Sequence, residues 1–217
     1  MRILAVNVAK PIVVSYRGKE ISTGIYKKPV HGSVMVRKTN IDGDAQADLN
    51  NHGGMDKAVY AFPHEHYVYY QKRLEQQRLE YGHFGENLTT EGMLESEVHI
   101  GDQFRIGEAV FEVSQPRSPC IKFAIKVGKP NAVKVMLDSG NTGFYLRVVR
   151  EGMIEAGQVT RLFLNEIAPT VAETHQLMYF DFLNVSRLKR ALDSSALSAK
   201  WRHEFASRLK KLEVSPN

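Results

Sequence analysis

The strongest constraint on the fold is a series of short apolar runs that covers the chain up to about residue 165. Each run is rich in β-branched or aromatic residues and is bounded by glycines or turns, which is typical of short strands. The N-terminal stretch predicts a first strand, and the clearest later runs are residues 34–36, 57–62, 109–114, 143–150 and 159–164. Helical patterns interrupt them only at 63 to about 80, 119–127 and 130–137. Because strands and helices do not alternate regularly, the sequence predicts a mainly β fold, a closed barrel with peripheral helices.

The pattern changes after Ile167, where apolar residues recur at helical spacing. Thr170 and Glu173 fit a capping box at the start of this region. The later apolar positions are Val185, Leu188 and Leu192, then Trp201, Phe205, Leu209 and Leu212. The sequence therefore predicts a barrel domain over 1–167 and a small all-α three-helix segment over 168–217. About fifty residues bury little core alone, so we expect these helices to pack on the barrel or on another chain, which leaves a homodimer open.

The net charge of +5 is concentrated in the C-terminal region. Residues 186–213 contain eight basic residues and three acidic ones, while the rest of the chain is balanced. The basic residues are Arg187, Lys189, Arg190, Lys200, Arg202, Arg208, Lys210 and Lys211. We expect the lysines and arginines to lie free on one helical face, where an acidic partner would dock. The alternative is a solvated face that only aids solubility.

The composition excludes several classes of site. The single cysteine, Cys120, rules out a disulfide framework, a thiolate metal cage and a cysteine-ligated iron–sulfur cluster. No run of about 18 apolar residues occurs and the N-terminus lacks a signal peptide's features, so we expect a cytoplasmic protein without a membrane span. We expect no stable nucleic-acid binding, because the basic residues are not interleaved with aromatic stacking residues.

Cys120 lies in the segment Gln-Pro-Arg-Ser-Pro-Cys that follows a predicted strand. Ser118 is a good N-cap and Pro119 suits the first helical position, so Cys120 is predicted as the second residue of a helix. The helix dipole, Arg117 and Lys122 would all favour a thiolate there, as a nucleophile or a soft-metal ligand. A buried, inert cysteine is an equally good interpretation of this local chemistry.

A glycine-rich turn precedes the predicted strand at 57–62. Gly53 and Gly54 permit a close backbone approach, and His52 and Lys57 could bind a phosphate beside exposed amide groups. A plain turn is the alternative interpretation.

Two further segments carry polar groups next to glycines. Phe84 and Gly85 precede Glu86 and Asn87, which suggests a close-packed loop with polar side chains aimed at a ligand or, alternatively, a surface turn. Lys27 follows a Thr-Gly pair and could add another cation to a phosphate-facing turn, although this signal alone is weak.

Together these segments resemble a known family. The motifs DGDAQAD (42–48), NHGGMDKAVY (51–60), FGENLT (84–89), IGD (100–102) and QPRSPC (115–120) occur in the order found in MOSC (molybdenum cofactor sulfurase C-terminal) domains of the YiiM type. The C-terminal region resembles the three-helix (3-alpha) domain that follows such domains. The resemblance implies a MOSC-type twisted β-barrel with peripheral helices that binds the molybdenum cofactor, a pterin dithiolene with a phosphate (molybdopterin).

The resemblance also implies roles for individual residues. Cys120 matches the cysteine that is taken as the protein ligand to molybdenum. The cofactor-binding set would be Lys27, His52, Gly53, Gly54, Lys57, Phe84, Asn87 and Arg117. Glu86 or Asp48 could supply a proton.

The implied activity is a molybdenum-cofactor-dependent reductase of N-hydroxylated bases such as 6-hydroxylaminopurine. Electrons would come from a partner reductase, since the chain shows no flavin, haem or iron–sulfur motif. The alternative is a carrier that binds the cofactor or its sulfur and passes it on without reductase activity.

Overall fold

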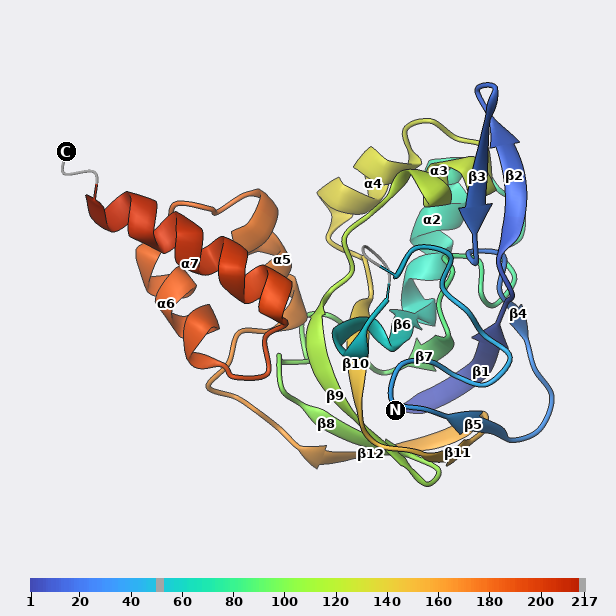
Figure 1. Cartoon of the computed structure of the whole chain (residues 1–217), viewed down its shortest axis with the longest axis horizontal. Coiled ribbons are helices and arrows are strands. Elements are labelled where there is room, and N and C mark those ends of the chain that lie inside the picture. Colours follow the sequence, from blue (N-terminus) through green and yellow to red (C-terminus); the bar gives the residue numbers. More distant parts are fainter. Residues whose placement is uncertain (50–52, 215–217) are drawn as a thin grey trace.

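The fold is described from a computed structural model, which covers residues 1–49 and 53–214. Its principal strands are β1 (Arg2–Val8), β6 (Val59–Pro63), β7 (Leu88–Glu91), β8 (Gln103–Ile106), β9 (Ala109–Pro116), β10 (Phe144–Arg150) and β12 (Gly157–Phe163). In the described part of the chain these seven strands pair in the order β12–β8–β9–β10–β6–β7–β1, and β1 pairs back with β12. The sheet is therefore closed, and the predicted barrel is confirmed (Figure 1).

Shorter strands extend the barrel wall. β4 (Lys28–Pro29) pairs with β1, and β5 (Val34–Val36) pairs with β11 (Gly152–Ile154). β2 (Ile12–Tyr16) and β3 (Lys19–Thr23) form a separate hairpin that projects from the barrel (Figure 1). The barrel neighbours are antiparallel except β6 and β7, which run parallel.

The barrel interior is filled by large side chains from most of its strands. Phe104, Phe111, Phe144, Leu88 and Leu146 are each fully buried in one cluster. Strands such as β6 and β9 are buried over nearly their whole length, because helices and loops cover the outer faces as well. This explains why their sequences are continuous apolar runs rather than strictly alternating ones.

The peripheral helices lie mainly beside β6 and β10. They are the 3-10 turns η1 (Met55–Lys57) and η2 (His64–His66), and the helices α2 (Tyr67–Leu74), α3 (Ile121–Val127) and α4 (Ala132–Ser139). The helix expected to reach about residue 80 ends at Leu74, because Glu75 adopts the left-handed region with φ 52°. A polar run follows Glu75 and offers no apolar face to continue the helix. Similarly, residue 57 belongs to η1, and the strand expected there begins at Val59.

The C-terminal helices are α5 (Val171–Tyr179), α6 (Val185–Asp193) and α7 (Ala199–Val214), and they pack on the barrel beside β9 (Figure 1). The capping box is present: Thr170 Oγ1 accepts from the Glu173 amide and the Glu173 carboxylate accepts from the Thr170 amide. Trp201 and Phe205 are buried in the same cluster as the barrel core. Within the described residues, no helix has both the length and the apolar character needed to cross a bilayer.

Many of the C-terminal cations bind within the chain. Four of them form ion pairs: Arg187 with Asp181, Lys189 with Glu213, Arg190 with Glu173 and Arg208 with Glu204. The guanidinium of Arg202 donates to the Leu192 and Ser194 carbonyls. The expectation that this region presents a face of free lysines and arginines is therefore wrong for these residues, since they hold the helices together. Lys200, Lys210 and Lys211 on α7 are exposed.

Candidate functional site

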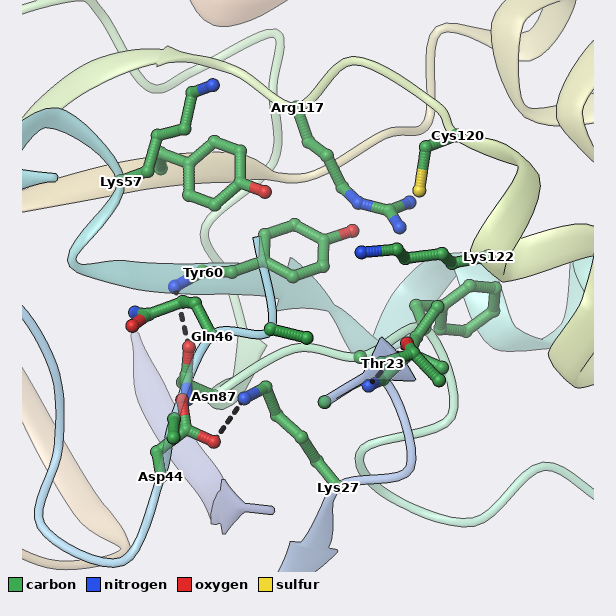
Figure 2. A pocket seen from close by; sticks show the side chains of 17 residues that line it. Thr23, Lys27, Asp44, Gln46, Lys57, Tyr60, Asn87, Arg117, Cys120 and Lys122 are labelled. Atoms are coloured by element: carbon green, nitrogen blue, oxygen red, sulfur yellow. Dashed lines mark hydrogen bonds and ion pairs between the residues drawn. The ribbon is translucent and has the colours of Figure 1, made fainter. Parts of the chain in front are cut away.

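One pocket collects most of the candidate residues (Figure 2). Its walls come from four segments and three further side chains, namely Thr23, Gly24, Ile25 and Lys27; Asp44, Ala45, Gln46 and Ala47; Phe84, Gly85 and Asn87; Arg117, Cys120 and Lys122; and Lys57, Tyr60 and Tyr145. About 560 Å³ of space lies between these walls, a volume that includes open solvent at the mouth of the pocket. Segments that are far apart in sequence thus meet at one face of the barrel.

Cys120 lies on the wall of this pocket, at the start of α3. The predicted helix start was two residues too early: Cys120 is the N-cap, with φ −139° and ψ 161°, and the helix begins at Ile121. Ser118 does not cap the helix, because its Oγ accepts a hydrogen bond from Tyr179 Oη at 2.9 Å. The thiol is half-buried and points toward the pocket and the side chain of Arg117 (Figure 2).

Arg117 is a buried cation beside this thiol, with 5% of its surface exposed. Its guanidinium carbon lies 4.9 Å from the centre of the Tyr60 ring and 5.9 Å from that of Phe123, and one nitrogen donates to Met136 Sδ at 2.9 Å. Burial tends to lower the pKa of Arg117, but nearby Tyr60 and Cys120 outweigh it, so the net shift is upward. Among the described residues no carboxylate forms an ion pair with Arg117, so its charge is directed at the thiol and at whatever the pocket binds.

Lys27 and Asn87 also line the pocket, but their polar groups bind a carboxylate. Asp44, 2% exposed, pairs with Lys27 Nζ through one oxygen and accepts from Asn87 Nδ2 at 2.9 Å through the other. Asn87 Oδ1 accepts from the Tyr60 amide at 3.1 Å. Burial lowers the pKa of Lys27, and Asp44 opposes that shift. Asn87 therefore fixes neighbouring backbone, and Asp44 is a site residue that the sequence analysis did not single out.

Lys57 is half-buried and lines the pocket from the end of η1. The pKa of Lys57 is lowered by burial first and then by the charge of Lys200 on α7, while Asp56 and Asp48 oppose the shift. Asp48, one of the two candidate proton donors, is near enough to Lys57 to affect its charge but is not among the residues that line the pocket. Lys122, on the first turn of α3, adds a further cation to the wall.

Phe84 and Glu86 belong to a tightly packed loop, as their spacing suggests. Phe84 is fully buried and stacks on Phe62, with ring centres 4.0 Å apart. A Cβ on Gly85, which has φ 81°, would lie 2.7 Å from the Ile25 side chain. Glu86 is fully buried and is not among the residues that line the pocket, so this geometry does not support it as a proton donor to a ligand there.

The glycine-rich turn is only partly described. Gly54 has φ 88°, the left-handed region that glycine tolerates, and a Cβ on Gly53 would lie 2.9 Å from the Cα of Leu49. Neither glycine is among the residues that line the pocket. His52 lies outside the described residues, so its predicted place at the site stays a prediction.

The pocket chemistry fits an anionic ligand that carries a soft metal. A thiol is a soft donor, and Arg117, Lys57 and Lys122 supply positive charge around it. In the chain outside residues 50–52 and 215–217, no three histidine, cysteine or acidic side chains gather to hold a metal ion. A metal bound by Cys120 would therefore need further ligands from its own cofactor, which a pterin dithiolene provides.

Comparisons with known proteins agree with this arrangement. Residues 48–161 match the MOSC domain and residues 169–212 match the YiiM-like, 3-alpha helix domain. The protein YflK of Bacillus subtilis (strain 168) is 43% identical over 97% of this chain and 95% of its own. The crystal structure of YiiM from Geobacillus stearothermophilus superposes with a TM-score of 0.81, at 35% identity over 95% of this chain and 98% of that one.

A more distant relative carries a functional name. A protein of Gibberella moniliformis (strain M3125 / FGSC 7600) named "Reductase" is 35% identical over 67% of this chain, a match that covers 26% of that longer protein. Both domain matches, the full-length relatives and the closed barrel point to one assignment, and the chain belongs to the MOSC family, with a YiiM-like 3-alpha helix domain after the barrel.

Proposed function

We propose that this protein is a molybdenum-cofactor-dependent reductase that converts N-hydroxylated bases, such as 6-hydroxylaminopurine, to amines. The observation that carries the proposal is the position of the Cys120 thiol beside the buried Arg117 guanidinium on the wall of one pocket. Family membership supports a role associated with this cofactor, either as a reductase or in handling its sulfur. A pocket lined by cations and aromatic side chains at the thiol favours a reductase over a carrier, which needs an accessible thiol more than a substrate pocket.

The residues on the pocket wall suit distinct parts of the cofactor. Cys120 would bind the metal through its thiolate, while Arg117, Lys57 and Lys122 would bind the anionic groups of the cofactor. Tyr60, Tyr145, Phe84 and Ile25 contribute apolar surface to the wall. When bound, the cofactor would supply the two-electron chemistry that reduces an N–OH group to an amine, with water as the second product.

A proton donor has to lie on the pocket wall, which Glu86 does not. Lys27 does lie there, and burial lowers its pKa, which makes its ammonium a stronger acid than an exposed lysine. We assign Lys27 Nζ to hold the proton delivered to the leaving hydroxyl group, with Asp44 fixing the orientation of the ammonium.

The electrons would come from a separate acidic reductase. The single cysteine cannot ligate an iron–sulfur cluster, so the chain has no such relay of its own. The exposed lysines of α7 are the part of the basic C-terminal region that this partner would meet.

The test compares wild type with Cys120→Ser, both produced in a host that makes the cofactor. We expect the wild type to retain molybdenum and to reduce 6-hydroxylaminopurine with a chemical reductant, and the variant to lose both while its thermal unfolding is unchanged. Molybdenum at the wild-type level in the variant would refute the ligand role of Cys120. A wild-type protein that holds molybdenum, shows no turnover and transfers its cofactor to an apo-enzyme would instead be a carrier.

A further inference from the structure

The C-terminal helices contact the two segments that carry the thiol and Lys57. α5 reaches the loop before α3, where Ser118 lies two residues from Cys120. The first residue of α7, Ala199, reaches η1, where Asp56 directly precedes Lys57. Neither contact belongs to the pocket itself, because Ser118, Asp56 and the helices do not line it.

The contact with the thiol loop is made by Tyr179, the last residue of α5. Its hydroxyl donates to Ser118 Oγ at 2.9 Å. The Tyr179 ring packs against His175, with ring centres 4.9 Å apart, and edge-on against the buried Trp201 at 6.3 Å. The hydroxyl is thus held by the helical core, and its position is set by α5 and α7 rather than by the loop.

The contact with η1 is made by Asp56. One carboxylate oxygen accepts from the Ala199 amide at 3.1 Å, and the other accepts two hydrogen bonds from Arg147 on β10, at 2.9 and 2.6 Å. The Asp56 carbonyl accepts from Ser114 Oγ at 2.5 Å, and the Ser114 carbonyl in turn accepts from the Ser198 amide at 3.0 Å. The start of α7, the barrel and η1 therefore form one hydrogen-bonded unit.

We propose that the C-terminal helices position the two sides of the pocket, and that Tyr179 is a positioning residue that holds Cys120 beside Arg117 through Ser118. The inference rests on the proposed function only in taking this pocket as the cofactor site. Arg117 is fixed by burial and by its amide, which donates to the Gly143 carbonyl at 3.1 Å. Ser118 is exposed and its Oγ accepts from Tyr179 Oη, so this hydrogen bond connects the helices to the loop between Arg117 and Cys120.

The experiment uses the thiol itself as the probe, in cofactor-free full-length protein. Cys120 is the only cysteine, so the rate of iodoacetamide alkylation against pH gives its apparent pKa directly. The variants are Tyr179→Phe, Ser118→Ala and the double variant. Displacing the thiol from the Arg117 charge should raise the pH midpoint of alkylation by about half a unit or more in each single variant. Since both changes remove the same hydrogen bond, the double variant should shift no further than either single one.

Tyr69→Phe is the matched control, since it also removes a tyrosine hydroxyl, on α2 and away from the pocket wall. It should keep the wild-type midpoint, and thermal unfolding should show that every variant is folded. A wild-type midpoint in Tyr179→Phe, or shifts that add in the double variant, would overturn the positioning role. Because this measurement needs no cofactor, a shifted midpoint would support the inference even if Cys120→Ser retained molybdenum and the proposed function failed.

Discussion

Glu86 is a buried carboxylate that organises the loop before β7. Its two oxygens accept four hydrogen bonds, from Tyr67 Oη at 2.6 Å, the Gly82 amide at 2.8 Å, the Phe84 amide at 2.9 Å and Thr89 Oγ1 at 2.9 Å. Such saturation satisfies a fully buried charge and leaves it poorly placed to exchange protons with a ligand.

Glu86→Gln should therefore destabilise the protein. The amide nitrogen can only donate, so it would face at least one of these donors, at a cost of about 1–3 kcal/mol. Urea unfolding measures this loss, and Glu91→Gln, at the exposed end of β7, is the control that should change little. If Glu86→Gln kept wild-type stability but lost turnover, a role as proton donor would regain support.

A site residue could be predicted from sequence only where the residues next to it in the chain indicate its chemical role. The Pro-Arg-Ser-Pro-Cys segment brings Arg117 and Cys120 together locally, and the structure places both on one wall. Asp44 gave no such signal, since its partners Lys27 and Asn87 lie 17 and 43 residues away. The four donors around Glu86 were not visible in the sequence either, because they come together only once the loop is folded.

At the scale of elements, Lys126 in the last turn of α3 connects this helix to two other segments near the pocket. Lys126 Nζ donates to the Ile25 carbonyl at 2.9 Å and to the Gly82 carbonyl at 2.7 Å. Burial lowers the pKa of Lys126 to about 8, although the charge of Glu86 opposes the shift. This one side chain connects the helix that begins at Ile121 to the segment after β3 and to the loop before β7.

Lys126 should give the protein a stability that rises in mild alkali. Between about pH 8 and its ordinary pKa of 10.5, Lys126 is neutral in the folded chain and charged in the unfolded one. The unfolded state then binds more protons, so this contribution grows as pH rises and is lost as pH falls through about 8. Urea unfolding measures the free energy of unfolding of the wild type and of Lys126→Met. The wild-type value minus the Lys126→Met value should increase between pH 8 and 10.

The control is Lys134→Met, because Lys134 is exposed and paired with Asp138 on α4. The difference in unfolding free energy between the wild type and Lys134→Met should stay constant between pH 8 and 10. A wild-type-to-Lys126→Met difference that stays constant with pH would show that Lys126 keeps its proton in the folded protein.

Element boundaries were less predictable than element types. Helix α2 ends at Leu74 because the next residue, Glu75, adopts the left-handed region. No glycine stands there to indicate such a conformation in the sequence. Helix α3 starts after Cys120 because Ser118, a good N-cap by type, bonds to Tyr179 across 61 residues. In both cases the helix boundary depends on backbone conformation or on a partner residue far away in the sequence. Intrinsic helix propensity carries no information on either.

At the scale of the whole molecule, the closed barrel was predictable because short runs of β-branched and aromatic residues without regular helical crossovers leave few alternatives. The sequence shows where in the chain the excess positive charge lies, but it does not show which of these side chains bind within the protein. Ion pairs and carbonyl contacts occupy five of the C-terminal cations, and these contacts join α5, α6 and α7. Among the described residues, the positive charge of this region that no ion pair or carbonyl contact engages is therefore smaller than the sequence suggests, and Lys200, Lys210 and Lys211 place it on α7.

This distribution decides which cations an acidic electron donor would meet. Replacing exposed Lys210 and Lys211 with Glu should lower kcat/KM for the natural donor about tenfold at low salt, and less at physiological salt, where charges beyond about 8 Å are screened. Turnover with a small chemical reductant should not change, because these residues lie outside the pocket. Arg187→Glu with Arg190→Glu should instead destabilise the helices by breaking their ion pairs. Equal losses with both reductants, or none with either, would show that the donor does not dock on α7.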